Sequence, residues 1–287
     1  MPARLVLNAD DFGLTHGINR AIAELHSSGV LSSATLMAAG PAFDDAVEVA
    51  RAHPMLGVGC HIVLTDGTPV SPPDSIRSLL DRDGENFRPS LVDFVQALLF
   101  GRINEEEVAR EALAQIEKLQ RAGIEITHLD THKHTHLFPS ITRPLLQVAE
   151  RCGIRAIRNP FEPDWSLTLD HGSRTRRLAV RLIGLLRPRF EAQAQIRDGR
   201  VQTTDGTVAI SATGQLNATT LGDILRALPS TGTYELCCHP GYNDGDLDRI
   251  TTRLRTHRDI EREALLSEIS KALARLDNLT LLHYGTL

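Results

Sequence analysis

Short apolar, β-prone runs alternate with amphipathic helical stretches along most of the chain, and this alternation constrains the fold more than any other feature. The runs RLVLNA at 4–9, GVGCHIV at 57–63 and GTYELCC at 232–238 have the length and composition of buried strands. VAREALAQIEKLQ, within 104–121, has the 3.6-residue period of an amphipathic helix. About seven or eight such alternations predict an α/β protein with a mainly parallel sheet closed into a barrel, and an open doubly wound sheet is the alternative.

The pattern places the elements as follows. Strands are expected at 4–9, 32–38, 57–63, 124–131, 155–157, 232–238 and 279–284, and helices at 16–28, 42–52, 91–100, 104–121, 140–151, 174–186, 218–228 and 255–276. Residues 187–215 fit neither period, and we expect a β-rich excursion there within a single domain that spans 1–287. The sequence has no G-x-G-x-x-G motif and no Walker loop, which argues against a nucleotide-binding sheet.

Composition excludes several classes of partner. The formal net charge of −5 gives no reason to expect a nucleic acid or an anionic membrane as partner. No run of 18 apolar residues occurs, so no membrane span is expected, and the apolar run at the N-terminus is too short for a signal peptide. Cys60, Cys152, Cys237 and Cys238 have no C-x-x-C spacing and are expected to be free thiols in a reducing compartment, so we expect a cytoplasmic protein.

Polar side chains follow the ends of three expected strands. Asp10 and Asp11 come directly after the first apolar run, where two adjacent carboxylates need a counter-charge such as a metal ion; a turn-forming pair is the alternative. His61 lies in an apolar strand and is either a metal ligand or a hydrogen-bonded core residue. His239, in LCCHPGY, is either functional or a turn residue. Because a barrel gathers its strand ends at one face, these groups are expected to lie together.

The stretch THLDTHKHTH at 127–136 holds four of the twelve histidines. On a strand, alternate residues share a face, so His128, Asp130, His132, His134 and His136 would point the same way while the extended geometry lasts. The strand is expected to end near residue 130 or 131, so not all of them can converge. Histidine is the commonest metal ligand near neutral pH, and the stretch predicts a metal site. One carboxylate and two imidazoles, with a position left for water, is the pattern of hydrolytic metal centres.

Four motifs occur in a specific order: NADDFGL at 8–14, G-x-G-x-H at 57–61, THLDTHKHTH followed by Phe-Pro, and CHP at 238–240. This set resembles the YdjC-like carbohydrate deacetylases, which include chitooligosaccharide deacetylases and the deacetylase-like proteins of hopanoid clusters. The resemblance covers 4–162 well and 232–284 more loosely, and it implies a distorted (β/α) barrel.

The resemblance also implies one divalent metal ion, held by Asp11, His61 and His132, with Asp10 as the general base. Zinc suits this ligand set best, and magnesium or another divalent ion is the alternative. His239 is our first choice as the proton donor to the leaving amine.

Several roles around this centre are left with alternatives. His134 is the second choice for the proton donor. Asp130 is expected to orient His132 or His239. Arg158 and Asn159 are candidates for contact with a sugar or a phosphate.

The implied function is that of a carbohydrate N-deacetylase, a hydrolase of a linear amide. Water activated at the metal would remove the acetyl group from N-acetylated amino sugars such as N-acetylglucosamine or short chitooligosaccharides. The alternatives are a deacetylase of a lipid-linked glycan and a catalytically silent metal- or sugar-binding protein. An amidohydrolase is disfavoured, because its H-x-H lies on the first strand. The expected partners are a small carbohydrate substrate and a second copy of the chain in a homodimer.

Overall fold

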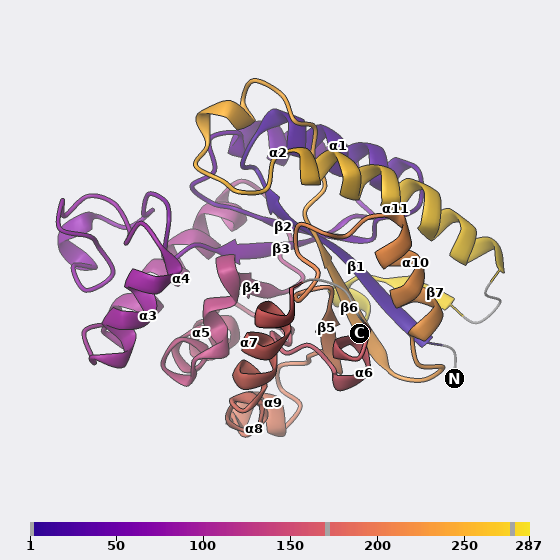
Figure 1. Ribbon diagram of the computed structural model, residues 1–287. Coiled ribbons are helices and arrows are strands. Elements are labelled where there is room, and N and C mark those ends of the chain that lie inside the picture. Colours follow the sequence, from indigo (N-terminus) through magenta and orange to yellow (C-terminus); the bar gives the residue numbers. More distant parts are fainter. Residues whose placement is uncertain (1–2, 170–172, 276–278) are drawn as a thin grey trace.

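A seven-stranded, wholly parallel sheet forms the centre of the molecule (Figure 1). The structure, a computed structural model, describes residues 3–169, 173–275 and 279–287. The strands are β1 (Ala3–Phe12), β2 (Ser33–Leu36), β3 (Gly57–Ile62), β4 (Leu129–Thr131), β5 (Gly206–Val208), β6 (Thr233–Cys238) and β7 (Leu279–Leu282). They lie in the order β4-β3-β2-β1-β6-β5, and β7 pairs with the first half of β1.

Residues 155–158 connect the two edges of this sheet. Leu129 of β4 bridges to Ile157, and Ala156 bridges in turn to Gln202, close to the start of β5. Backbone hydrogen bonds of 2.9–3.0 Å from Leu129 N to Ala156 O and from Arg158 N to Leu129 O hold the first contact. The sheet therefore curls into a distorted (β/α) barrel, and the expected fold is confirmed. The expected strand at 155–157 is present only as these isolated bridges.

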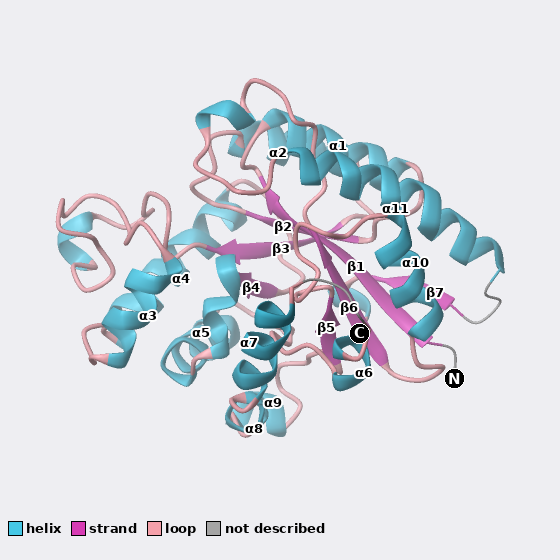
Figure 2. Cartoon of the chain, in the orientation of Figure 1, coloured by secondary structure: helices cyan, strands magenta, loops and turns pink. Residues whose placement is uncertain are grey.

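Helices cover the outside of the sheet (Figure 2). They are α1 (His16–Ser27), α2 (Phe43–Ala52), α3 (Leu91–Leu99), α4 (Glu105–Arg121), α5 (Pro139–Arg151), α6 (Asp164–Leu167), α7 (Arg174–Gly184), α8 (Arg187–Glu191), α9 (Ala194–Arg197), α10 (Ala218–Ala227) and α11 (Thr256–Arg275), with 3-10 turns η1 (Pro73–Ser75), η2 (His132–Leu137), η3 (Leu247–Arg249) and η4 (Tyr284–Thr286). The long helices follow the apolar periodicity of the sequence. Thr15 caps α1 by accepting a hydrogen bond from Ile18 N.

Two expectations about local structure are wrong. Residues 187–215 do not form a β-rich excursion: they contain α8, α9 and the three-residue β5, which pairs with β6 in the main sheet. Pro188 in the first turn of α8 and the Glu, Ala and Gln residues that follow favour helix, and Phe190 anchors this segment in the core. The strand expected at 124–131 is shorter, because only Leu129–Thr131 reaches β3.

One large apolar core lies between the sheet and its helices, with members from Leu5 near the start of β1 to Ala272 in α11. In the part of the chain that the structure describes, no helix combines the length and apolarity needed to cross a membrane. The core therefore holds the strands in fixed register, and their carboxyl ends meet at one face of the barrel.

Candidate functional site

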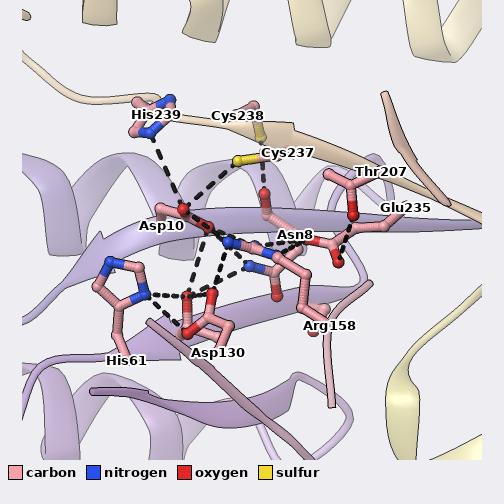
Figure 3. Close-up of polar contacts among 12 residues, drawn as sticks. Asn8, Asp10, His61, Asp130, Arg158, Thr207, Glu235, Cys237, Cys238 and His239 are labelled. Atoms are coloured by element: carbon pink, nitrogen blue, oxygen red, sulfur yellow. Dashed lines mark hydrogen bonds and ion pairs between the residues drawn. The ribbon is translucent and has the colours of Figure 1, made fainter. Parts of the chain in front are cut away.

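The polar residues from the strand ends converge in one buried cluster (Figure 3). Asp10 and Asp11 come from β1, His61 from β3, Asp130 from β4, and His239 follows β6. His61 and Asp130 lie opposite each other in the register of the β3–β4 pair. The expectation that these strand ends meet is confirmed.

An irregularity in β1 turns its two carboxylates toward the same site. Neighbouring residues of a regular strand point to opposite faces of the sheet. Here the register with β2 shifts between Ala9 and Phe12, and Asp11 adopts a left-handed conformation with φ of 65°. Aspartate tolerates this conformation better than most residues, and bulges of this kind often aim side chains in active sites. Both carboxylates consequently reach the cluster.

Asp11, His61 and His132 form a group that could hold a metal ion, with one ligand atom from each within 4.8 Å of the others. Asp11 Oδ1 lies 3.8 Å from His61 Nε2 and 3.4 Å from His132 Nδ1. This oxygen is buried without a hydrogen-bond partner, whereas Asp11 Oδ2 accepts a 2.6 Å hydrogen bond from Arg258 Nη2. A buried carboxylate oxygen that faces two imidazole nitrogens fits a divalent cation, because the ion would supply the missing partner.

Asp130 orients His61, and not His132 or His239 as the sequence suggested. Asp130 Oδ1 lies 2.7 Å from His61 Nδ1, and Thr35 Oγ1 donates to Asp130 Oδ2 at 3.1 Å. This contact leaves His61 Nε2 directed toward Asp11. Burial lowers the pKa of His61, but the charge and hydrogen bond of Asp130 outweigh burial and raise that pKa to about 9. An aspartate behind a metal-binding histidine fixes the ring and its tautomer.

Arg158 is the buried counter-charge of Asp10 rather than a surface contact for substrate. Its Nη1 and Nη2 donate to Asp10 Oδ2 and Oδ1 at 2.9 and 2.6 Å. The same guanidinium lies 2.6 Å from Asp130 and donates through Nε to Glu235 at 2.7 Å. Burial raises the pKa of Asp10, but Arg158 outweighs burial and holds that pKa well below its usual range. Asp10 is therefore a carboxylate at neutral pH, in a fixed orientation.

The two adjacent aspartates thus obtain their counter-charges from arginines. Arg158 compensates Asp10 and Arg258 compensates Asp11. The sequence argument correctly required a counter-charge and named a metal ion as an example, but it did not identify the two arginines. The metal remains the natural partner only for Asp11 Oδ1.

His239 lies on the far side of Asp10 from His61, as Figure 3 shows. Its Nε2 is 3.9 Å from Asp10 Oδ2, and its ring is partly open to solvent. The backbone N–H of His239 donates to Glu261 Oε2 at 2.6 Å, which fixes the chain at this point. The imidazole is therefore placed where a substrate group could reach both it and Asp10.

Of the other histidines in 127–136, none joins this group of potential ligands. His128 stacks on Tyr284 with ring centroids 3.9 Å apart. His136 lies 2.7 Å from Thr131 Oγ1 and 3.2 Å from the carbonyl of Arg158. His134 has a left-handed backbone with φ of 53° and a buried, unpartnered Nδ1. Because the chain leaves the extended conformation after Thr131, only Asp130 and His132 of the alternating set reach the site.

Sequence reasoning missed several residues of the site. Thr35, at the end of β2, carries the same signal as the others, a polar residue at the end of an apolar strand. Arg258 and Glu261 lie in α11, more than two hundred residues from Asp11, and no local pattern identifies them. Glu235 lies in the middle of β6 and is buried against Arg158.

Comparison with known proteins places the chain in a family. The model of the YdjC-like proteins matches residues 4–275. The chain belongs to this family. A relative from Brevibacillus brevis named carbohydrate deacetylase is 43% identical over 158 residues, which are 55% of this chain and 60% of that relative. The match thus spans less than two thirds of this relative's length.

Two other proteins resemble the chain over nearly its whole length. A carbohydrate deacetylase of Thermoanaerobacter pseudethanolicus is 26% identical over 286 residues, 99% of this chain and 98% of the relative. The crystal structure of an Enterococcus faecalis V583 protein, described as a candidate cellobiose-phosphate cleavage protein, superposes with a TM-score of 0.77 at 26% identity and covers 100% of this chain and 99% of that one. The YdjC-like fold therefore extends over the regions of weak motif similarity.

Proposed function

We propose that this chain is a metal-dependent hydrolase that removes the acetyl group from N-acetylated amino sugars, with N-acetylglucosamine or short chitooligosaccharides as substrates. The observation that carries the proposal is the unpartnered Asp11 Oδ1 between His61 and His132, beside the second, ionised carboxylate of Asp10. Pure metal binding needs only the carboxylate of Asp11, and the carboxylate of Asp10 is placed to accept a proton. The two relatives named carbohydrate deacetylase support the acetylated sugar as substrate class.

Asp11, His61 and His132 would hold the metal ion. A divalent ion bound there supplies a Lewis acid that polarises an amide carbonyl and makes water more acidic. Two imidazoles and one carboxylate favour zinc, although affinity order alone does not select the metal.

Asp10 and His239 divide the proton transfers. As water attacks the acetamide carbon, Asp10 takes a proton from it; as the C–N bond breaks, His239 gives a proton to the nitrogen, so that acetate and a free amine leave. Arg158 keeps Asp10 ionised and therefore able to accept a proton, although the same contact makes Asp10 a weaker base. Since His239 Nε2 lies 3.9 Å from Asp10, one substrate amide can lie near both.

The direct test is acetate release from N-acetylglucosamine and from diacetylchitobiose. Protein stripped with a chelator is assayed alone and after each divalent metal is added back. We expect acetate only with metal, and the most active metal and sugar length identify the cofactor and the substrate. Stoichiometric metal binding without acetate from either sugar would contradict the proposal and favour a lipid-linked glycan as substrate or a silent binding protein.

Replacing Asp10 with Asn separates a catalyst from a binder. Because the amide cannot accept the proton, we expect turnover to fall by about 10²–10⁴-fold while bound metal stays the same. Metal content by elemental analysis and thermal unfolding would accompany the assay. Asp83→Asn, in an exposed loop, is the matched control. Equal turnover in Asp10→Asn and the parent would refute the role of Asp10 as base.

A further inference from the structure

The outer side of α7 carries an apolar stripe that no residue within 3–169, 173–275 and 279–287 covers. Leu178, Leu182 and Leu185 are 59%, 59% and 74% exposed. Their spacing of four and three residues places them on one side of the helix, and we call them the leucine stripe. No residue of α7 is buried, although Ile183 on another side of the helix packs against the core. The helix is therefore attached to the barrel by one side and presents its leucines to the surroundings.

Arginines accompany the leucine stripe. Residues 173–190 contain six arginines and no acidic residue, in a chain whose net charge is −5. Arg174 and Arg181 lie one turn before and almost one turn after Leu178, along the same side of the helix. A surface hollow of about 450 Å³ opens beside them. Its lining consists of Leu167, Thr168, Arg174, Arg177, Leu178 and Arg181.

The combination of exposed leucines and arginines on α7 distinguishes among the possible binding partners. A second copy of the chain, docked through a two-fold axis, would bring the arginines of one α7 against those of the other, and like charges across an interface are unfavourable. A nucleic acid would accept the arginines but would leave the leucines in water. A membrane with anionic lipids meets both, because headgroup phosphates bind arginine while leucines enter the boundary of the acyl chains.

We propose that α7 docks this protein on an anionic lipid surface, with the leucine stripe inserted at the acyl boundary and a headgroup phosphate in the arginine-lined hollow. The sequence-based expectation of no membrane partner rested on the net charge of the whole chain. A lipid surface responds to the charge within about 8–10 Å at physiological salt, and residues 173–190 carry six arginines and no acidic side chain.

The test is sedimentation of the full-length protein with vesicles of phosphatidylcholine alone or of phosphatidylcholine and phosphatidylglycerol in equal parts. We expect binding to the mixed vesicles, weakened by added salt. Arg174→Gln with Arg181→Gln should weaken binding by roughly 25-fold, about fivefold for each arginine. Leu178→Ser with Leu182→Ser should weaken it by at least about tenfold.

Matched controls come from other exposed positions. Leu99→Ser with Phe100→Ser removes apolar side chains that are 75% and 72% exposed on and just after α3, and Arg249→Gln removes an arginine whose side chain is 84% exposed. These variants should bind vesicles as the parent does. Hydrolysis of a small water-soluble substrate should be unchanged in all variants, so the docking proposal and the proposed activity can fail separately.

Three outcomes would overturn the proposal. The first is no binding to the mixed vesicles at low salt. The second is binding to either kind of vesicle that the α7 variants do not weaken. The third is a dimer in light scattering that Leu178→Ser with Leu182→Ser converts to a monomer, which would make the leucine stripe a contact between two copies of the chain.

Discussion

Replacing Asp130 with Asn should change the number of protons released when a metal ion binds. In the parent protein Asp130 contacts His61 Nδ1 at 2.7 Å and raises the pKa of His61 to about 9. A metal binds only the neutral imidazole, so its binding must displace a proton from His61 at neutral pH. The affinity should therefore rise about tenfold per pH unit up to about pH 9 and level off above it.

The expected number of protons released follows from the shift in the pKa of His61. Raising the pKa of His61 from its usual 6.5 to about 9 favours the protonated ring by roughly 3 kcal/mol. At pH 7.5 His61 is almost fully protonated in the parent, which predicts release of about one proton per metal ion. In Asp130→Asn burial acts with less opposition, so the pKa of His61 falls and clearly less than one proton per metal ion is released at pH 7.5.

Titration calorimetry measures this directly. Zinc is added to chelator-stripped protein at one pH in several buffers with different ionisation heats, and the slope of the observed heat against ionisation heat gives the protons released. Thr35→Val is the control, because it removes the contacts of Thr35 Oγ1 with Asp130 Oδ2 and His61 Nδ1 and leaves the charge of Asp130 in place. Equal proton release by the parent and Asp130→Asn, or none by the parent, would refute the electrostatic role of Asp130.

Three further predictions concern stability. Arg158→Met leaves buried carboxylates unpaired and should lower the free energy of unfolding by about 3–5 kcal/mol in urea titrations, with Arg158→Lys intermediate; a loss under 1 kcal/mol would contradict the charge assignment. A Cβ at position 59 would overlap the ring of His128, so Gly59→Ala should cost about 1–3 kcal/mol, whereas Gly184→Ala, which meets no atom within 4 Å, should cost nothing. His128, His134 and His136 have pKa values that burial lowers to about 3 or 4; they stay neutral in the fold and take up protons once unfolded below about pH 6.5. The stability that these three histidines contribute should thus be complete above pH 6.5 and be lost as the pH falls toward 4, and a urea midpoint that stays constant between pH 6.5 and 4 would contradict this assignment.

The proposed proton acceptor illustrates how far sequence reasoning reached. Asp10 and Asp11 were placed correctly at the end of the first strand, because an apolar run followed by charged residues marks a strand end wherever it occurs. The direction of the two side chains was not predictable. It depends on a register shift against β2 and a left-handed residue, and both arise from pairing with a separate strand.

The histidine-rich stretch shows the same limit. The period of two in THLDTHKHTH correctly put Asp130 and His132 near the other strand ends. The expected strand end near residue 130 or 131 is confirmed, because β4 ends at Thr131, but the period could not show what the histidines after His132 contact. Of the two histidines after His132, His136 contacts Thr131 and the carbonyl of Arg158, whereas Nδ1 of His134 has no hydrogen-bond partner.

The sequence by itself determined the alternation of strands and helices and the positions of the polar strand ends, because periodicity and residue type are local properties. The choice of Asp11, His61 and His132 as potential metal ligands came from the resemblance to the YdjC-like family. Only the tertiary structure decided which charges face one another. Arg158 and Arg258 compensate aspartates about 150 and 250 residues earlier in the chain, and Asp130 faces His61 rather than its near neighbour His132. Such pairings exist because folding removes charges from water, and a buried carboxylate then requires whichever cation the fold brings within hydrogen-bonding distance.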